Sequence, residues 1–142
     1  MTRINRTSQT LTSLSLATAL AAAYYLFFIP TIEKYPGFYA GTPLPPMMKT
    51  AWGYFTWDGQ GANTITTFIF FLTPVILTSV SFIIIKRTTG AKKTVGLWGL
   101  TALMLIAMLI GTPDLGPVFI PAAVFLLAAA LNETRNVSND PS

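Results

Sequence analysis

Four apolar runs, each close to the length of a membrane-crossing helix, constrain this chain more than any other feature. A helix needs about 20 predominantly apolar residues to cross the hydrocarbon core of a bilayer. The runs predict spans over residues 11–32, 64–85, 95–112 and 115–132. Charged residues make up 10% of the chain, whereas a soluble domain carries about 25%. We therefore expect one domain of 142 residues, an all-α integral membrane protein built as a four-transmembrane-helix bundle.

Basic residues gather on one side of the expected membrane. They precede span one, fill the link between spans two and three, and follow span four: Arg3, Arg6, Lys86, Arg87, Lys92, Lys93 and Arg135. On the other side, Lys34 and Lys49 are offset by Glu33 and Asp58. Because an excess of Lys and Arg marks the cytoplasmic side, we expect a plasma-membrane protein whose tails, residues 1–10 and 133–142, are loose and cytoplasmic.

The N-terminus admits a second interpretation. The sequence "MTRINR", an apolar run and "ALAAA" together resemble a secretory signal with a cleavage site. However, the apolar run continues to Ile29, beyond the usual length of a signal core. We therefore expect an uncleaved first span, with a cleaved signal as the alternative.

Composition excludes several kinds of chemistry. The chain has no cysteine and no histidine, so thiol nucleophiles, thiolate or imidazole metal sites and a histidine general base are excluded. The expected spans contain no ionisable residue, which argues against a proton relay within one copy. The short basic clusters beside apolar runs are a topology signal and not a nucleic-acid site. We expect no cofactor, no metal, no catalytic residue and no nucleic-acid partner.

Span two has an internal pattern. Hydroxyl side chains and Pro74 share one helical face, opposite most of the bulky residues. We interpret this face as a polar packing seam whose hydroxyls bond to a neighbouring helix or satisfy the Phe70 carbonyl that Pro74 leaves unbonded. The alternative is half of a polar pathway or a small-ligand cleft. The seam residues are Thr66, Thr67, Thr73, Thr78 and Ser81.

The outer loop, residues 33–63, is rich in aromatic residues and proline. We expect a short helix from Pro46 onward, lying in the headgroup region with Met48, Trp52 and Phe55 on its apolar face. Its tryptophans are typical interfacial anchors; the alternative is a binding surface for a carotenoid, quinone, lipid or partner protein. The candidate contact residues are Met48, Lys49, Trp52, Phe55, Trp57 and Asp58.

These features favour a small non-enzymatic membrane protein. We expect an accessory or assembly subunit, or a homo-oligomer, that contacts the lipid bilayer and docks a membrane-protein partner or a second copy through the outer loop. One alternative is an oligomeric channel or transporter for a small solute that uses the Thr/Ser face of span two. Another is a lipid-modifying enzyme that uses Asp58, Glu33 or Lys49.

Overall fold

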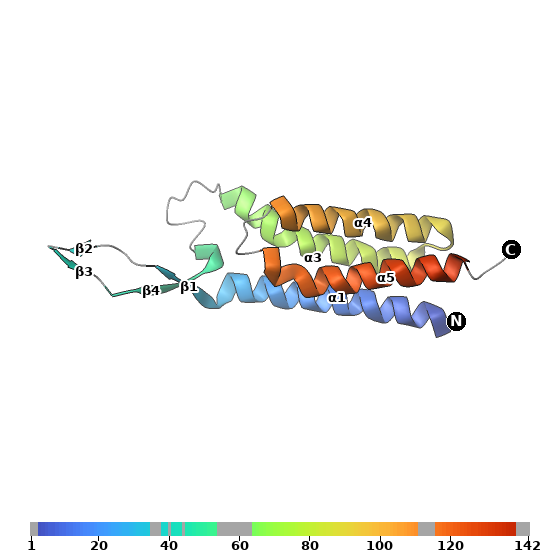
Figure 1. The fold of residues 1–142 in the computed structure, drawn as a ribbon, viewed down its shortest axis with the longest axis horizontal. Helices are drawn as coiled ribbons and strands as arrows, with labels where there is room; N and C mark the ends of the chain where they lie inside the picture. Colours follow the sequence, from blue (N-terminus) through green and yellow to red (C-terminus); the bar gives the residue numbers. More distant parts are fainter. Residues whose placement is uncertain are drawn as a thin grey trace.

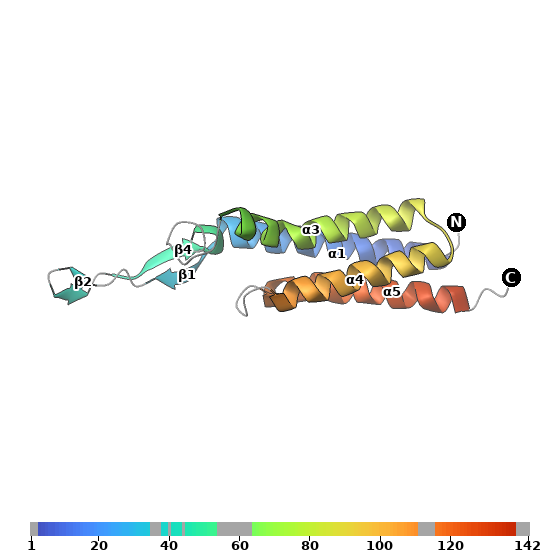
Figure 2. The same ribbon diagram turned by 90° about the horizontal axis from the view of Figure 1, so that it is seen from above.

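Four long helices lie side by side in the computed structural model, which describes residues 3–34, 38–39, 41–43, 45–53, 64–110 and 116–138. They are α1 (Arg3–Phe28), α3 (Thr64–Arg87), α4 (Ala91–Ile110) and α5 (Ile120–Ser138). The short 3-10 helix η1 (Gly116–Phe119) leads directly into α5. Both termini lie at the same end of the bundle (Figures 1 and 2). The predicted all-α four-helix bundle is confirmed.

The helices form a closed ring of neighbours, in which α1 packs against α3 and α5, and α4 packs against the same two helices. Small residues allow a close approach of α1 and α5, where Ala19, Ala22 and Ala122 are buried. The Ser15 hydroxyl donates a hydrogen bond of 2.7 Å across this contact to the Ala122 carbonyl. The contact between α1 and α5 is therefore made by short side chains.

Large apolar side chains cover the outside of the bundle. Leu109 is 83% exposed, and Val95 and Ile110 are similarly open. Such a surface is unfavourable in water but matches the hydrocarbon of a bilayer. All four helices have the length and composition to cross a membrane. The chain is a multi-pass membrane protein.

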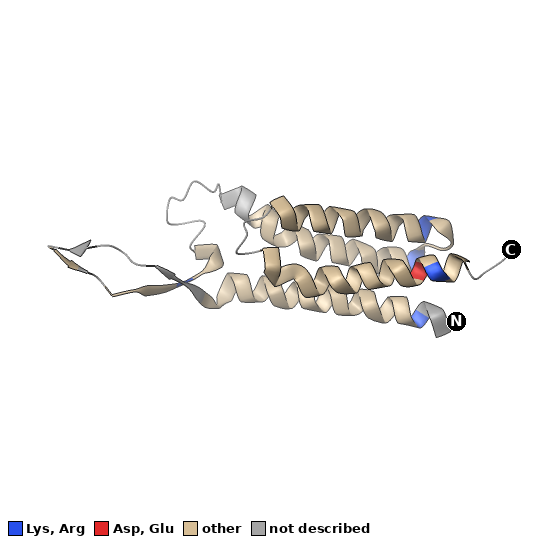
Figure 3. Ribbon diagram, in the orientation of Figure 1, with Lys and Arg blue, Asp and Glu red and all other residues tan. Residues whose placement is uncertain are grey.

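The helices differ from the expected spans at their ends. Helix α1 already begins at Arg3 and α5 continues to Ser138, so much of the two tails expected to be loose is helical. At its other end α1 stops at Phe28, because Pro30 cannot supply a helical backbone donor. The basic residues of the link lie in the last turn of α3 and the first turn of α4, at the same end as the termini (Figure 3).

A narrow two-stranded ribbon projects from the opposite end of the bundle (Figures 1 and 2). Strand β1 (Pro30–Lys34) pairs antiparallel with β4 (Met47–Thr50), and β2 (Phe38–Tyr39) pairs with β3 (Thr42–Pro43). Gly41 has a φ of 84°, a conformation that glycine adopts without steric cost, and it turns the chain back between β2 and β3.

The ribbon corrects the prediction of a helix starting at Pro46. Met47–Thr50 is a strand, and helical structure begins only at Ala51 and continues to Gly53, where the described segment ends. The pairing with β1 explains the difference, because it satisfies backbone groups of residues 47–50 that a helix would otherwise bond internally. Sequence periodicity alone does not reveal such a non-local partner.

Candidate functional site

The first candidate site is an aromatic cluster where the ribbon meets the bundle. The Trp52 ring packs on Phe27 of α1, with ring centroids 5.1 Å apart. It also lies against Phe68 and Phe71 of α3, at 5.9 Å and 6.3 Å. The preceding Ala51 is 1% exposed. Trp52 therefore joins the base of the ribbon to two helices, and its ring is half-buried by this packing.

The remaining outer-loop candidates divide into two groups. Met48 is 58% exposed on strand β4, and Lys49 next to it is half-buried. Because Met48 lies in a strand and Trp52 in the following turn, the two do not form one helical face as expected. The Thr50 hydroxyl accepts a hydrogen bond of 3.0 Å from the Gly53 amide and stabilises that turn. Phe55, Trp57 and Asp58 lie outside the described residues.

The hydroxyl face of span two lies within α3, and it is largely buried. Thr78 and Ser81 are fully buried and Thr73 is half-buried. Each hydroxyl donates to a carbonyl one turn earlier in its own helix, at 2.7 Å to 2.9 Å. For Thr73 the acceptor is Ile69, and not the Phe70 carbonyl that Pro74 was expected to leave unbonded. The side chains of Thr66 and Thr67 lie outside what the structure describes.

These bonds correct the expectation that the seam hydroxyls reach across to a neighbouring helix. A hydroxyl has one hydrogen to donate, and in these three residues it is used within α3. The face packs inside the bundle as a seam of small polar side chains. A seam of this kind offers acceptor lone pairs but no spare donor for a solute.

A buried ion pair is the feature that sequence reasoning missed. The Lys93 ammonium of α4 lies 3.0 Å from a Glu133 carboxylate oxygen of α5, and the two side chains are 8% and 7% exposed. The other Glu133 oxygen, Oε1, has no hydrogen-bond partner among the described residues. The expected spans stopped two residues short of Lys93 and one residue short of Glu133, so neither residue was counted as intramembrane. Both lie in helices that are apolar enough to span a membrane.

The helical spacing of the buried residues could have indicated this ion pair. On α4 the buried positions Lys93, Leu97, Thr101 and Met104 follow one another at three or four residues. On α5 the buried series ends with Ala129, Ala130 and Glu133. Residues at such spacings share one helical face, so extending the apolar series by one turn would have placed both charges in the interior.

Further polar contacts surround the ion pair at the terminal end of the bundle. The Asn132 amide donates a 2.7 Å hydrogen bond to the Ser8 hydroxyl and connects α5 to α1. The Trp98 indole donates a 2.9 Å bond to the Thr134 hydroxyl and connects α4 to α5. Within the described ranges, His, Cys, Asp and Glu do not gather in a group of three that would hold a metal ion.

The residues brought together here are therefore suited to packing, anchoring and neighbour selection. No family model, curated protein or solved structure matches this chain.

Proposed function

We propose that this chain is a non-enzymatic accessory subunit of a plasma-membrane complex, and that it docks a partner membrane protein through its outer ribbon, residues 30–53. The observation that carries the proposal is the ribbon itself, which projects beyond the bundle and is attached at its base by Trp52 (Figure 1). The bundle acts as the membrane anchor, and the ribbon acts as the docking element.

The energetics of a two-stranded ribbon support a partner. An isolated pair of strands is marginally stable in water, and a third strand or a packing surface is needed for independent stability. Only the base of this ribbon packs on the helices, through Ala51 and Trp52, among the described side chains. Met47 and Met48 on β4 are exposed. A strand or loop of another protein would pair with an open edge and cover these methionines.

The charge distribution supports an outward-facing ribbon. Arg6, Lys86, Arg87, Lys92 and Arg135 are exposed at the terminal end of the bundle (Figure 3). An excess of basic residues marks the cytoplasmic side, so both termini would be cytoplasmic and the ribbon would stand on the opposite face. The partner is then a protein with a segment outside the membrane on that face.

Three observations disfavour the other functions considered. The chain lacks histidine and cysteine, and Lys93 and Glu133 face each other as a pair inside the bundle. The hydroxyls of Thr78 and Ser81 already donate to their own helix, which leaves them poorly suited to guide a solute. A non-enzymatic subunit therefore fits this interior better than an enzyme or a channel.

Site-specific photo-crosslinking tests the proposal. Met48→p-benzoylphenylalanine places a photoreactive ring on the ribbon, and Leu109→p-benzoylphenylalanine is the matched control on a lipid-facing surface of α4. In membranes of the native host, we expect the ribbon probe to form one discrete adduct with a second, different polypeptide, and the control to label lipid. Trp52→Ala loosens the base of the ribbon and should reduce the adduct several-fold while the chain stays in the membrane.

Two results would contradict the proposal. An adduct with twice the mass of the chain would assign the ribbon to self-association and make the protein a homo-oligomer. Equal labelling of many proteins, unchanged by Trp52→Ala, would show that the ribbon has no dedicated partner.

A further inference from the structure

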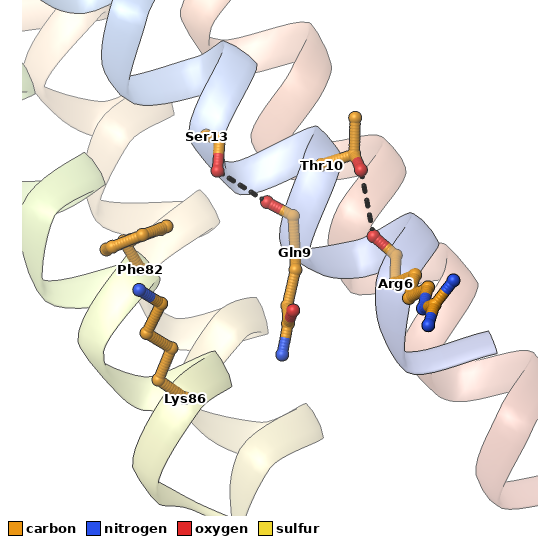
Figure 4. A pocket seen from close by; sticks show the side chains of 6 residues that line it. All are labelled: Arg6, Gln9, Thr10, Ser13, Phe82 and Lys86. Atoms are coloured by element: carbon orange, nitrogen blue, oxygen red, sulfur yellow. Dashed lines mark hydrogen bonds between the residues drawn. The ribbon is translucent and has the colours of Figure 1, made fainter. Parts of the chain in front are cut away.

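A basic cleft opens between α1 and α3 at the terminal end of the bundle. Its volume is about 440 Å³, and it is lined by Arg6, Gln9, Thr10, Ser13, Phe82 and Lys86. In Figure 4 the Gln9 side chain extends into the space between the two helices, with Lys86 and Phe82 on the facing helix and Arg6 one turn nearer the terminus. The cleft is distant from the ribbon, which leaves the bundle at its other end (Figure 1).

We propose that this basic cleft binds the headgroup of an anionic phospholipid that carries hydroxyl groups, of the phosphatidylglycerol type. Two cations from different helices line the cleft, and no acidic residue is among the lining residues. At this end of the bundle Glu133 is turned into the interior against Lys93. The cleft is therefore a local excess of positive charge at the level where phospholipid phosphates lie.

The two cations have different roles in holding a phosphodiester. The Lys86 ammonium lies 4.2 Å from the centroid of the Phe82 ring, and this cation–π contact holds it at the wall of the cleft. Arg6 is exposed at the aqueous rim, where its planar guanidinium can donate two parallel hydrogen bonds to phosphate oxygens. In Figure 4 the Arg6 side chain points away from Lys86, so this exposed guanidinium would turn toward the cleft to share a phosphate with Lys86.

The hydroxyl groups of the cleft explain the choice of headgroup. The Thr10 hydroxyl donates to the Arg6 carbonyl at 2.9 Å, and the Ser13 hydroxyl donates to the Gln9 carbonyl at 2.8 Å. Since each hydroxyl has one hydrogen, the two oxygens can meet a ligand only as acceptors. A headgroup with hydroxyl donors, such as glycerol, satisfies them, whereas choline has no hydrogen-bond donor.

The surface beyond the cleft suits acyl chains. On α1 the cleft-lining face continues from Ser13 to Ala17 and Leu20, four and seven residues further along. On α3 it continues from Phe82 to Val75, seven residues earlier. Leu20 is 51% exposed, and the small Ala17 leaves room beside it. A lipid whose phosphate sits in the cleft can lay its acyl chains along this apolar strip.

Lipid binding to the full-length protein in detergent tests the proposal, by native mass spectrometry with phosphatidylglycerol and phosphatidylcholine of matched chains. We expect one phosphatidylglycerol to be retained per chain, at least tenfold more tightly than phosphatidylcholine. The variant R6Q/K86Q should lose about 20- to 30-fold in affinity, because each basic residue near an anionic surface contributes about fivefold. The control R87Q/K92Q removes the same net charge from exposed positions outside the lining and should keep the bound lipid.

A steric variant separates the cleft from bulk charge. Ser13→Phe fills the space while leaving both cations, and it should displace the lipid without changing the helical content measured by circular dichroism. Each of three results would overturn the proposal. The two lipids could be retained equally, or phosphatidylglycerol could be retained unchanged by both R6Q/K86Q and Ser13→Phe. Alternatively, glycerol phosphate at millimolar concentration could displace the lipid completely. The last would assign the cleft to a small soluble anion.

Discussion

Removing one member of the Lys93–Glu133 pair should destabilise the bundle far more than removing both. The residues join α4 to α5 at 3.0 Å, with both side chains more than nine-tenths buried. Lys93→Met and Glu133→Met each place an unbranched apolar side chain of similar length in the interior and remove one charge of the pair. The double variant Lys93→Met/Glu133→Met replaces the pair by two apolar side chains that pack in the same space.

The geometry of the pair sets the size of each effect. At 3.0 Å and an effective dielectric constant near 20, the attraction is about 5 to 6 kcal/mol. Desolvation of the two ions costs several kcal/mol each, so the net contribution of the intact pair is close to zero. Breaking a buried pair costs about 3–5 kcal/mol, whereas an apolar replacement is neutral or stabilising by about 1–4 kcal/mol.

The two single variants should also differ from each other. In Glu133→Met, the long stem of Lys93 can extend its ammonium toward the headgroups. Glutamate is shorter, and one oxygen of Glu133 already lacks a hydrogen-bond partner in the described part of the chain. We therefore expect Lys93→Met to be the more destabilising change. Lys92→Met removes the same charge from an exposed neighbouring position and should shift stability by less than about 0.5 kcal/mol.

Reversible unfolding in mixed micelles, followed by circular dichroism, measures these differences as a double-mutant cycle. The expected order of stability is the double variant at or above the native chain, then Glu133→Met, then Lys93→Met. If both single variants stay within about 0.5 kcal/mol of the Lys92→Met control, the charges are solvated and the burial argument is wrong. A double variant as unstable as the worse single variant would equally refute the reasoning.

Two further predictions concern backbone contact and the hydroxyl seam. Gly116→Ala places a Cβ 2.8 Å from the Met108 carbonyl oxygen and should destabilise the chain by about 1–3 kcal/mol. Gly99→Ala instead meets open space within a helix and should stabilise the chain by about 0.5–1 kcal/mol. Thermal unfolding of both variants in one detergent checks that the two changes in stability have opposite signs. Thr78→Val removes a hydroxyl bonded within α3 and should leave solute flux in proteoliposomes at the level of the native chain; a changed flux would revive the polar-pathway alternative.

The sequence predicted the helices well because membrane spans follow from a local property. A run of about 20 apolar residues is sufficient for a span, whatever the rest of the chain does. The outer ribbon depends instead on pairing between two segments that are distant in the sequence. Residues 47–50 form a strand because residues 30–34 lie opposite them. Trp52 was one of the candidate contact residues in the outer loop, but its contact with Phe27 of α1 could be found only once the fold was known.

The two ends of the bundle are held together by different interactions, and this division has a consequence for helix order. At the ribbon end, the contacts are aromatic and apolar, as between Trp52 and Phe71. In a bilayer such contacts discriminate weakly between neighbours, because lipid tails are as apolar as the side chains.

At the terminal end, polar contacts bind particular pairs of helices. Ser8 and Asn132 connect α1 to α5, and Lys93 and Glu133 connect α4 to α5. A wrong neighbour would leave these groups unpaired in a medium that cannot solvate them. We therefore infer that α5 selects its neighbours at the terminal end. Contacts at the ribbon end then contribute little to the choice of helix neighbours, which leaves the residues there available for a docking surface.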